Sequence, residues 1–408
     1  MSIVQDSGSE VARYDYTEDD FVLHTAPWAD GQPSQLSPFD KELHKRWDAA
    51  MAAGAFRYGI DHILTRIIPG SKGYVGQLNT LRATERRKPQ EISSVSQPFN
   101  PKAFNFTWIK PGEVIFDLHN TTDGPLKNGD ASAAGEAGHV SDGAVTNGHA
   151  QTTEAAQVSA NGVEHSAEGK KSAVHRLVIN VSPMEYGHCL LVPDVFGERP
   201  QVLTLTALKV AIETLLLCKH RGARLGFNSL CALSSVNHQH FHMYYFTYEQ
   251  IVDHYPVDHL AGDYYEFTSL PCPGFVMQLH GTTVEGLARS AHKISSYLHE
   301  NDIAHNLFMC RGVAFGEKRD STLTTIRLFI WPRKKFIAHL EGNKSSEEFN
   351  VACIELGGHL PIKEEAGYYN LTEEDVDKII ETACLSEEHY QEIKATVIKM
   401  GQEVSNAS

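Results

Sequence analysis

The stretch SSVNHQHFHMYYF (Ser234–Phe246) places histidines at every second position. In a β-strand successive side chains point to opposite faces, so His238, His240 and His242 would share one face of a sheet. The pattern therefore predicts a strand over residues 237–246 that presents three neighbouring imidazoles.

Three interpretations of this row of imidazoles compete. The first is a set of hydrogen-bonded side chains on a half-solvated sheet face. The second is a zinc site. The third is a centre of covalent catalysis in which one imidazole is the nucleophile. Neutral imidazoles are common zinc ligands, but three alternate side chains on one strand splay too widely to converge easily on a tetrahedral ion. The residues around the motif favour covalent catalysis.

Size and charge narrow the class of protein. A chain of 408 residues can bury one large core or two ordinary ones, which suits a two-lobed enzyme. The formal net charge of −15 disfavours nonspecific binding to nucleic acid, because such binding depends on cationic surface. We therefore expect no nucleic-acid partner.

Cysteine usage and hydropathy point to a cytoplasmic protein. The seven cysteines are odd in number, scattered and never spaced as C-x-x-C, which fits neither a disulfide framework nor a thiolate zinc site. The first residues lack the basic and apolar regions of a signal peptide, and no later stretch is apolar enough to span a membrane. We expect reduced thiols and no membrane partner.

Composition divides the chain into four parts. Residues 1–35 are acidic and weakly patterned, which predicts a flexible N-terminal tail or a loosely docked arm. Residues 120–171 are rich in Gly, Ala, Ser and Thr and lack aromatic residues, which predicts a disordered low-complexity insertion. This insertion would interrupt a catalytic half made of residues 36–119 and 172–265, and residues 266–402 would form a C-terminal half.

Periodicity in the remaining sequence predicts an α+β fold with a mainly antiparallel sheet. Ser37 can cap a helix that begins at Pro38, and further helical patterns cover 202–220, 284–302 and the region after 370. Apolar runs predict strands over residues 113–118, 175–181, 187–193, 225–233, 304–310 and 324–332. Strand runs mixed with single helices favour this arrangement over a doubly wound parallel sheet. No glycine-rich dinucleotide or phosphate-loop motif is present.

Two blocks carry a resemblance to a known superfamily. HQHFHMYY (238–245), preceded by NVSPMEYGHCLLVP (180–193), resembles the histidine-triad superfamily of nucleotide hydrolases and nucleotidyltransferases, which includes galactose-1-phosphate uridylyltransferase. Further blocks resemble its GDP-hexose phosphorylase branch: FDKELHKRWDAAMAAGAFRY, PGSKGYVGQLN, RRKP, SVSQPFNPKAFNFTWI, GFNSLCALSS and ELGGHLPIK. The resemblance extends from about Phe39 to the C-terminal helices.

This resemblance implies a histidine-triad-like, mainly antiparallel sheet with packed helices, in two triad-like halves as in the uridylyltransferase. GGHLPIK (357–363) faintly repeats GHCLLVP (187–193). It either marks the second half or is a glycine-marked turn beside a strand.

The resemblance also implies catalytic roles. His240 would attack the α-phosphorus of the nucleotide. His238 and His242 would fix the tautomer of His240 and donate hydrogen bonds to phosphate oxygens, and His188 would be the fourth histidine of the superfamily, opposite the triad.

The resemblance also implies which residues bind the substrate. Ser235 would bind phosphate or the leaving group, Asn180 would meet the ribose, and Asn228 would orient phosphate or nucleotide. A second anion requires cationic side chains near the triad. The candidates are Arg57, the cluster Arg86, Arg87 and Lys88, and the cluster Arg333, Lys334 and Lys335.

The implied reaction is phosphorolysis of GDP-D-glucose by a ping-pong route. GMP would pass to His240 with release of glucose 1-phosphate, and inorganic phosphate would then remove the guanylyl group as GDP. No cofactor and no catalytic metal are needed. His242 occupies a position that is glutamine in the uridylyltransferase and in the plant phosphorylases, which favours GDP-D-glucose as the substrate.

Several alternatives stay open from the sequence. They are phosphorolysis of GDP-L-galactose, hydrolysis of the nucleotide sugar by a triad hydrolase, a metal-dependent hydrolase, and a nucleotide-binding protein without activity. A monomer and a homodimer are both compatible with the sequence.

Overall fold

The computed structural model describes residues 3–4, 11–29, 32–123, 173–267, 269–337 and 348–407. The chain divides into a unit of residues 1–121 with 173–408 and a unit of residues 122–172. The second unit lies almost entirely outside the described residues, and so does the predicted disordered insertion.

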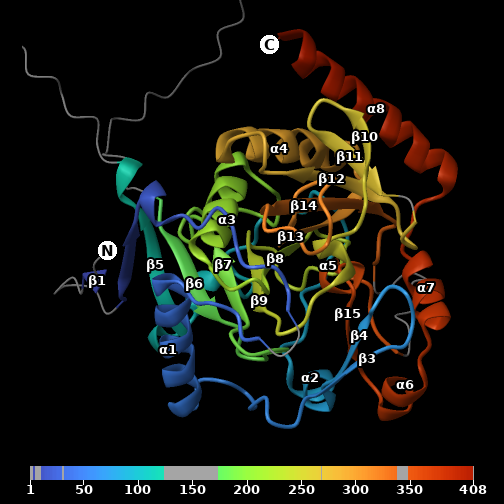
Figure 1. The fold of residues 1–408 in the computed structure, drawn as a ribbon. Coiled ribbons are helices and arrows are strands. Elements are labelled where there is room, and N and C mark those ends of the chain that lie inside the picture. Colours follow the sequence, from blue (N-terminus) through green and yellow to red (C-terminus); the bar gives the residue numbers. More distant parts are fainter. Residues whose placement is uncertain are drawn as a thin grey trace, which may run out of the picture. The chain divides into compact units, whose positions relative to one another are not determined.

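The described residues form one large and one small β-sheet (Figure 1). In spatial order the large sheet contains β1 (Ile3–Val4), β2 (Arg13–Tyr16), β5 (Val114–Asn120), β6 (His175–Ile179), β7 (Cys189–Val192), β9 (Phe241–Tyr245), β8 (Ala223–Asn228), β13 (Ala304–Val313), β14 (Thr324–Arg333), β12 (Gly274–Gln278), β11 (Tyr264–Phe267) and β10 (Asp258–Ala261). The small sheet contains β15 (His359–Ile362), β4 (Val75–Leu78) and β3 (Leu64–Ile67). Within the large sheet all neighbours are antiparallel except β2 and β5, which confirms the predicted α+β class.

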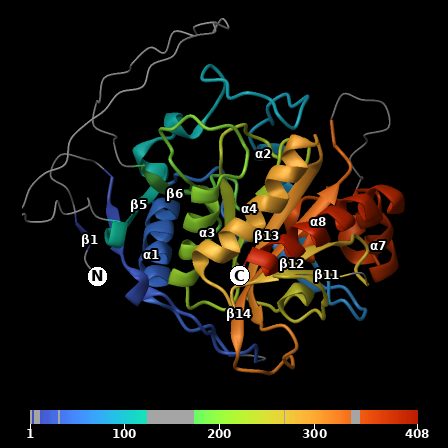
Figure 2. The same ribbon diagram turned by 90° about the horizontal axis from the view of Figure 1, so that it is seen from above.

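Helices lie between and around the strands. They are α1 (Pro38–Ala52), α2 (Thr80–Glu85), α3 (Leu205–Leu217), α4 (Val284–Glu300), α5 (Cys353–Leu356), α6 (Glu365–Asn370), α7 (Glu373–Glu381) and α8 (Glu387–Ala407). Figure 2 shows α1, α3 and α4 in a row over one face of the large sheet, where their apolar side chains join the largest buried cluster. None of the described helices combines the length and the apolar character that crossing a membrane requires.

The large sheet is built from two halves with the same strand order. In the first half β5, β6 and β7 are followed by α3 and then by the hairpin β8–β9, and β9 pairs with β7. In the second half β10, β11 and β12 are followed by α4 and then by the hairpin β13–β14, and β14 pairs with β12. The two halves join where β8 pairs with β13.

The second half begins earlier in the chain than predicted, because β10 starts at Asp258 and not near residue 266. GGHLPIK is not its marker. Its strand β15 pairs in parallel with β4 of the small sheet, and Gly358 before it has a φ of +98°, which favours glycine. The interpretation as a glycine-marked turn beside a strand is therefore the correct one.

Part of the predicted N-terminal tail is ordered. Strand β2 pairs in parallel with β5, and its alternate residues Tyr14 and Tyr16 are each only 2% exposed. The Tyr14 ring stacks on Phe116 at a centroid distance of 5.2 Å. The acidic composition suggested a tail, but the alternating aromatic residues decide the structure because they bury apolar surface against the sheet.

The predicted strand over residues 237–246 is shorter than expected, since β9 begins only at Phe241. Backbone N–H groups just before it bond to loops and not to a neighbouring strand. Asn237 donates to the Gln90 side chain at 2.8 Å, Gln239 donates to the Arg199 carbonyl at 3.0 Å, and His240 donates to the Gln201 side chain at 2.8 Å. The first two histidines of the motif therefore lie outside regular strand geometry.

Asp40 connects the start of α1 to the end of α3. The Ser37 hydroxyl caps α1 as predicted, and Asp40 Oδ2 accepts from the Ser37 N–H at 2.8 Å. The same oxygen accepts from the backbone N–H groups of Lys219 at 2.8 Å and His220 at 3.1 Å. Asp40 is fully buried, so its loss would leave these donors without partners.

We expect Asp40→Ala to lower the free energy of unfolding by about 2–4 kcal/mol, because a cap and two buried hydrogen bonds are lost together. Urea denaturation at pH 7 measures this change. Lys41→Ala, on the exposed side of the same helix turn, is the control and should change stability by less than about 0.5 kcal/mol. An equal effect of the two substitutions would contradict the role assigned to Asp40.

Candidate active site

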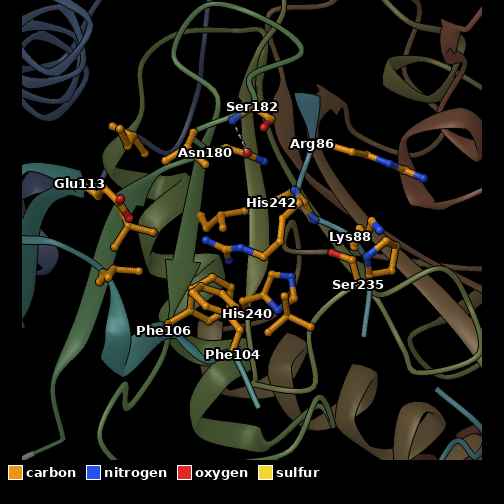
Figure 3. A pocket seen from close by; sticks show the side chains of 18 of the residues that line it. Arg86, Lys88, Phe104, Phe106, Glu113, Asn180, Ser182, Ser235, His240 and His242 are labelled. Carbon is orange, nitrogen blue, oxygen red and sulfur yellow. Dashed lines mark hydrogen bonds between the residues drawn. The ribbon is translucent and has the colours of Figure 1, made fainter. Parts of the chain in front are cut away.

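A pocket lies over the sheet face opposite to α3. Its floor follows residues that pair directly across neighbouring strands: His242 opposite Leu190, Leu190 opposite Val178, and Val178 opposite Val114. About 780 Å³ of space lies within its walls, and this figure includes space that is open to solvent. Its lining comprises Arg82, Arg86, Arg87, Lys88, Pro89, Phe104, Phe106, Ile109, Glu113, Val178, Ile179, Asn180, Val181, Ser182, Leu190, Ser235, Val236, His240 and His242 (Figure 3).

The environment of His240 assigns its tautomer. Its Nδ1 lies 2.7 Å from the His238 carbonyl oxygen and 3.0 Å from Gln201 Oε1. Both partners are acceptors, so Nδ1 must carry the proton and Nε2 keeps the free lone pair. Burial lowers the pKa of His240 to about 4, so the imidazole is neutral at pH 7. These are the properties that a nucleophilic imidazole needs.

Gln201 holds His240 in this state. The Gln201 Nε2 group donates to the carbonyl oxygens of Asn228 at 3.0 Å and His240 at 3.1 Å. Its Oε1 is thereby turned to accept from both the backbone N–H and the Nδ1–H of His240. Gln201 is 1% exposed, and the sequence contains no signal that connects it with the triad.

His188 and His242 form a second hydrogen-bonded chain. The Met184 N–H donates to His188 Nδ1 at 3.0 Å, so the proton of the neutral His188 ring lies on Nε2. This Nε2 is 3.1 Å from the Asn180 side-chain nitrogen and 3.2 Å from His242 Nδ1. His242 Nδ1 then accepts, and its own proton lies on Nε2. Burial lowers the pKa of both imidazoles well below the ordinary value, which keeps them neutral. His242 can therefore offer an N–H to a ligand in the pocket.

The His238 ring is turned away from this pocket. Its Nδ1 accepts the Phe106 N–H at 3.0 Å, and the ring packs against Phe99 and Phe106. It is fully buried and is not part of the lining. The His238 group that contacts His240 Nδ1 is the backbone carbonyl.

Of the predicted binding residues, Asn180 and Ser235 line the pocket. Asn228 does not line it: its Oδ1 accepts from Asn306 Nδ2 at 2.7 Å and from the Cys353 N–H at 2.9 Å, which ties the two halves together. Arg57 is also outside the lining, and its guanidinium donates to the Glu85 carbonyl at 2.6 Å. The structure brings the first two residues to the triad and leaves the other two apart.

Of the predicted basic clusters, residues 86–88 line the pocket and residues 333–335 do not. The Arg87 guanidinium lies 3.2 Å from the centre of the Phe104 ring. Burial, followed by the charge of Arg82, lowers the pKa of Arg86, which means that cationic charge is gathered here with little compensation. Arg82, which the sequence analysis missed, joins the lining from α2 and donates to the Ser182 carbonyl. Such a surface attracts phosphate groups.

The zinc interpretation of the triad requires convergent ligands. Across the described residues, no group of three His, Cys, Asp or Glu side chains is arranged to hold a metal ion. The His238 ring in particular packs against Phe99 and Phe106 and is not in the lining that contains His240 and His242.

Comparison with solved structures identifies the class of fold. The chain resembles yeast Ap4A phosphorylase Apa2, with a TM-score of 0.50 and 15% identity over 86% of this chain and 96% of that chain. The complex of the same enzyme with AMP gives a TM-score of 0.51 with 13% identity, over 86% of this chain and 98% of that chain. These likenesses establish a shared fold.

Comparison of sequences identifies the family. Residues 38–138 and 151–244 match the family described as GDPGP1-like, N-terminal domain, and residues 253–403 match the corresponding C-terminal domain. The chain therefore belongs to the GDPGP1-like family, which confirms the resemblance found in the sequence.

Named relatives agree with this assignment. Human GDP-D-glucose phosphorylase 1 is 36% identical over 94% of this chain and 91% of its own length. The Danio rerio protein of the same name is 35% identical, over 95% and 98% respectively. Arabidopsis thaliana GDP-L-galactose phosphorylase 2 is 26% identical over 86% of this chain and 74% of its own length.

The buried imidazoles make stability dependent on pH. Burial lowers the pKa values of His238, His240 and His305 from 6.5 to about 4. Between these values the unfolded chain binds protons that the folded chain does not, so the free energy of unfolding falls as the pH falls below 6.5. The contribution of each of these imidazoles to the free energy of unfolding is complete above pH 6.5. About 2 kcal/mol of each contribution is lost by pH 5.

We expect urea denaturation at pH 7.5 and pH 5.0 to show this loss. His305 is buried outside the pocket, and His305→Gln should lose about 2 kcal/mol less than the parent protein over the same range. Parallel stability curves for the variant and the parent would contradict a lowered pKa for His305.

Proposed function

We propose that this chain catalyses the phosphorolysis of a GDP-hexose, GDP-D-glucose in particular, to GDP and glucose 1-phosphate. The observation that carries the proposal is the state of His240, a neutral imidazole with its proton held on Nδ1 beside a cationic pocket. The names of the relatives that cover nearly the whole chain support the choice of substrate.

In the first step His240 Nε2 attacks the α-phosphorus of GDP-glucose. The P–N bond forms as the bond from the α-phosphorus to the bridging oxygen breaks, and that oxygen leaves on glucose 1-phosphate. The imidazole becomes cationic as its lone pair is shared. The His238 carbonyl and Gln201 Oε1 both accept the Nδ1–H and so stabilise this charge.

In the second step an oxygen of inorganic phosphate attacks the same phosphorus and the P–N bond breaks, which releases GDP and restores neutral His240. The His242 N–H would bind a non-bridging phosphate oxygen during both steps, and Arg82 and Lys88 would offset the negative charge. Ser235, at the edge of the lining, would bind the leaving or entering phosphate.

We also place the reaction in the cytoplasm. All seven cysteines lie in the described residues and none is paired, as is usual in a reducing compartment.

Product analysis with GDP-glucose tests the function. With phosphate we expect GDP and glucose 1-phosphate in equal amounts, unaffected by a chelator. His240→Asn should lower kcat/KM by at least about 1,000-fold, because the imidazole that would form the covalent intermediate is removed. His389→Asn, on α8, is the matched control and should keep full activity.

Other outcomes identify the alternatives. GMP formed without phosphate would make the protein a hydrolase. Loss of activity with the chelator would make it metal-dependent. No turnover of any GDP-hexose would leave a nucleotide-binding protein.

Gln201 provides a test of the mechanism. Gln201→Met keeps the side-chain volume and removes the acceptor for Nδ1–H, so kcat should fall by about 10- to 100-fold while KM changes little. Rapid-quench measurement of the first turnover should locate the loss in formation of the guanylyl-histidine. Gln391→Met on the exposed face of α8 is the control. A rise in KM with unchanged kcat would instead assign Gln201 to substrate binding.

A further inference from the structure

A single carboxylate, that of Glu113, stands among the described residues that line the pocket. It ends a short 3₁₀ turn, Pro111–Glu113, directly before β5. Figure 3 shows it on the side of the pocket opposite to Ser235 and Lys88. Its surroundings contain the Arg87 charge, but the structure shows no hydrogen bond or ion pair from the described residues to either carboxylate oxygen. The carboxylate is thus free to bind a ligand.

The sheet register fixes how far Glu113 lies from the triad. Four adjacent strands carry, in turn, His242, Leu190, Val178 and Val114. Three interstrand spacings therefore separate His242 on β9 from Val114, the residue next to Glu113. At roughly 4.8 Å each, these spacings amount to about 14 Å between backbones. Side chains project into the pocket from both ends. A nucleoside monophosphate with its phosphate at His240 can bridge the remaining distance.

The surface between the two ends suits a nucleobase. Val178 and Leu190 form an apolar floor, and Phe104, Phe106 and Ile109 stand beside it. Aromatic and aliphatic side chains bind the faces of a base without regard to its identity. The polar edge of the base must then decide which nucleotide is accepted, and Glu113 is the acidic group of the described lining that can meet that edge.

We infer that Glu113 selects guanine, by accepting hydrogen bonds from the N1–H and the 2-amino group of the base with its two oxygens. This inference rests on the proposed function. Guanine carries these two donors side by side, which matches the geometry of a carboxylate. Adenine presents an unprotonated N1 at the same place, and its lone pair would oppose the carboxylate. Hypoxanthine keeps the N1–H and lacks the amino group.

Glu113 has no part in the chemical step under this inference. It lies at the far end of the pocket from His240, so it cannot exchange a proton with the reacting phosphate. Its removal should change nucleotide binding and specificity, and kcat at saturating substrate should change little.

Binding measurements test the inference independently of turnover. Titration calorimetry with GDP and IDP should show that the parent protein prefers GDP by about tenfold or more, because one hydrogen bond to a charged group separates the two ligands. In Glu113→Ala this preference should disappear, because GDP should bind about 100-fold more weakly and IDP about tenfold more weakly than to the parent protein. Glu113→Gln keeps one acceptor and should lie between. Glu300→Gln, at the end of α4 and outside the lining, should match the parent protein.

The same ratio should appear in kcat/KM for GDP-glucose and IDP-glucose. An unchanged GDP-to-IDP preference in Glu113→Ala would overturn the inference, whether or not the protein is active. Absence of turnover by the parent protein would overturn the proposed function alone, because the binding ratios would still report on Glu113. If Glu113→Ala shows no cooperative urea transition, Glu113→Gln takes its place in the comparison.

Discussion

The hydrogen bonds between Gln201 and His240 are the constraint on which the site depends. They bind the backbone N–H, the carbonyl oxygen and the ring of one residue to a single amide group. Because the His240 backbone is occupied in this way, β9 cannot begin before Phe241. His240 therefore stands just outside the sheet, in the lining of the pocket, with its Nδ1 occupied by two acceptors.

The site contains two kinds of side chain, buried neutral imidazoles and cationic groups. The imidazoles of His188, His240 and His242 are enclosed, and desolvation keeps them neutral. The cationic side chains of Arg86, Arg87 and Lys88 line the pocket from the loop after α2. A protonated imidazole could not attack phosphorus, and it would also be repelled by these neighbours. The arrangement thus places neutral imidazoles and cationic side chains in the lining of one pocket.

Two halves share a strand order, but only the first contains the row of His238, His240 and His242. Strand β14, which corresponds in topology to β9, reads TTIRLFIWPR and contains no histidine. The second half instead supports the first. Asn306 on β13 and Cys353 on α5 both donate to Asn228, whose carbonyl in turn accepts from Gln201. A residue that looked like a ligand of phosphate in the sequence is a link between this support and the amide that holds His240.

The sequence by itself determined those features that depend on neighbouring residues. The capped helix at Ser37, the α+β class and the proposal of His240 as the nucleophile follow from capping, spacing and a motif within a short stretch. The tertiary structure alone decided the partners of these groups. Gln201 reaches His240 across 39 positions, and the sheet register sets Glu113 at the far end of the pocket. The His238 ring turned away because Phe106, 132 positions distant, donates to it. Local patterns report local backbone preferences, whereas hydrogen bonds between distant segments exist only after the chain topology has brought them together.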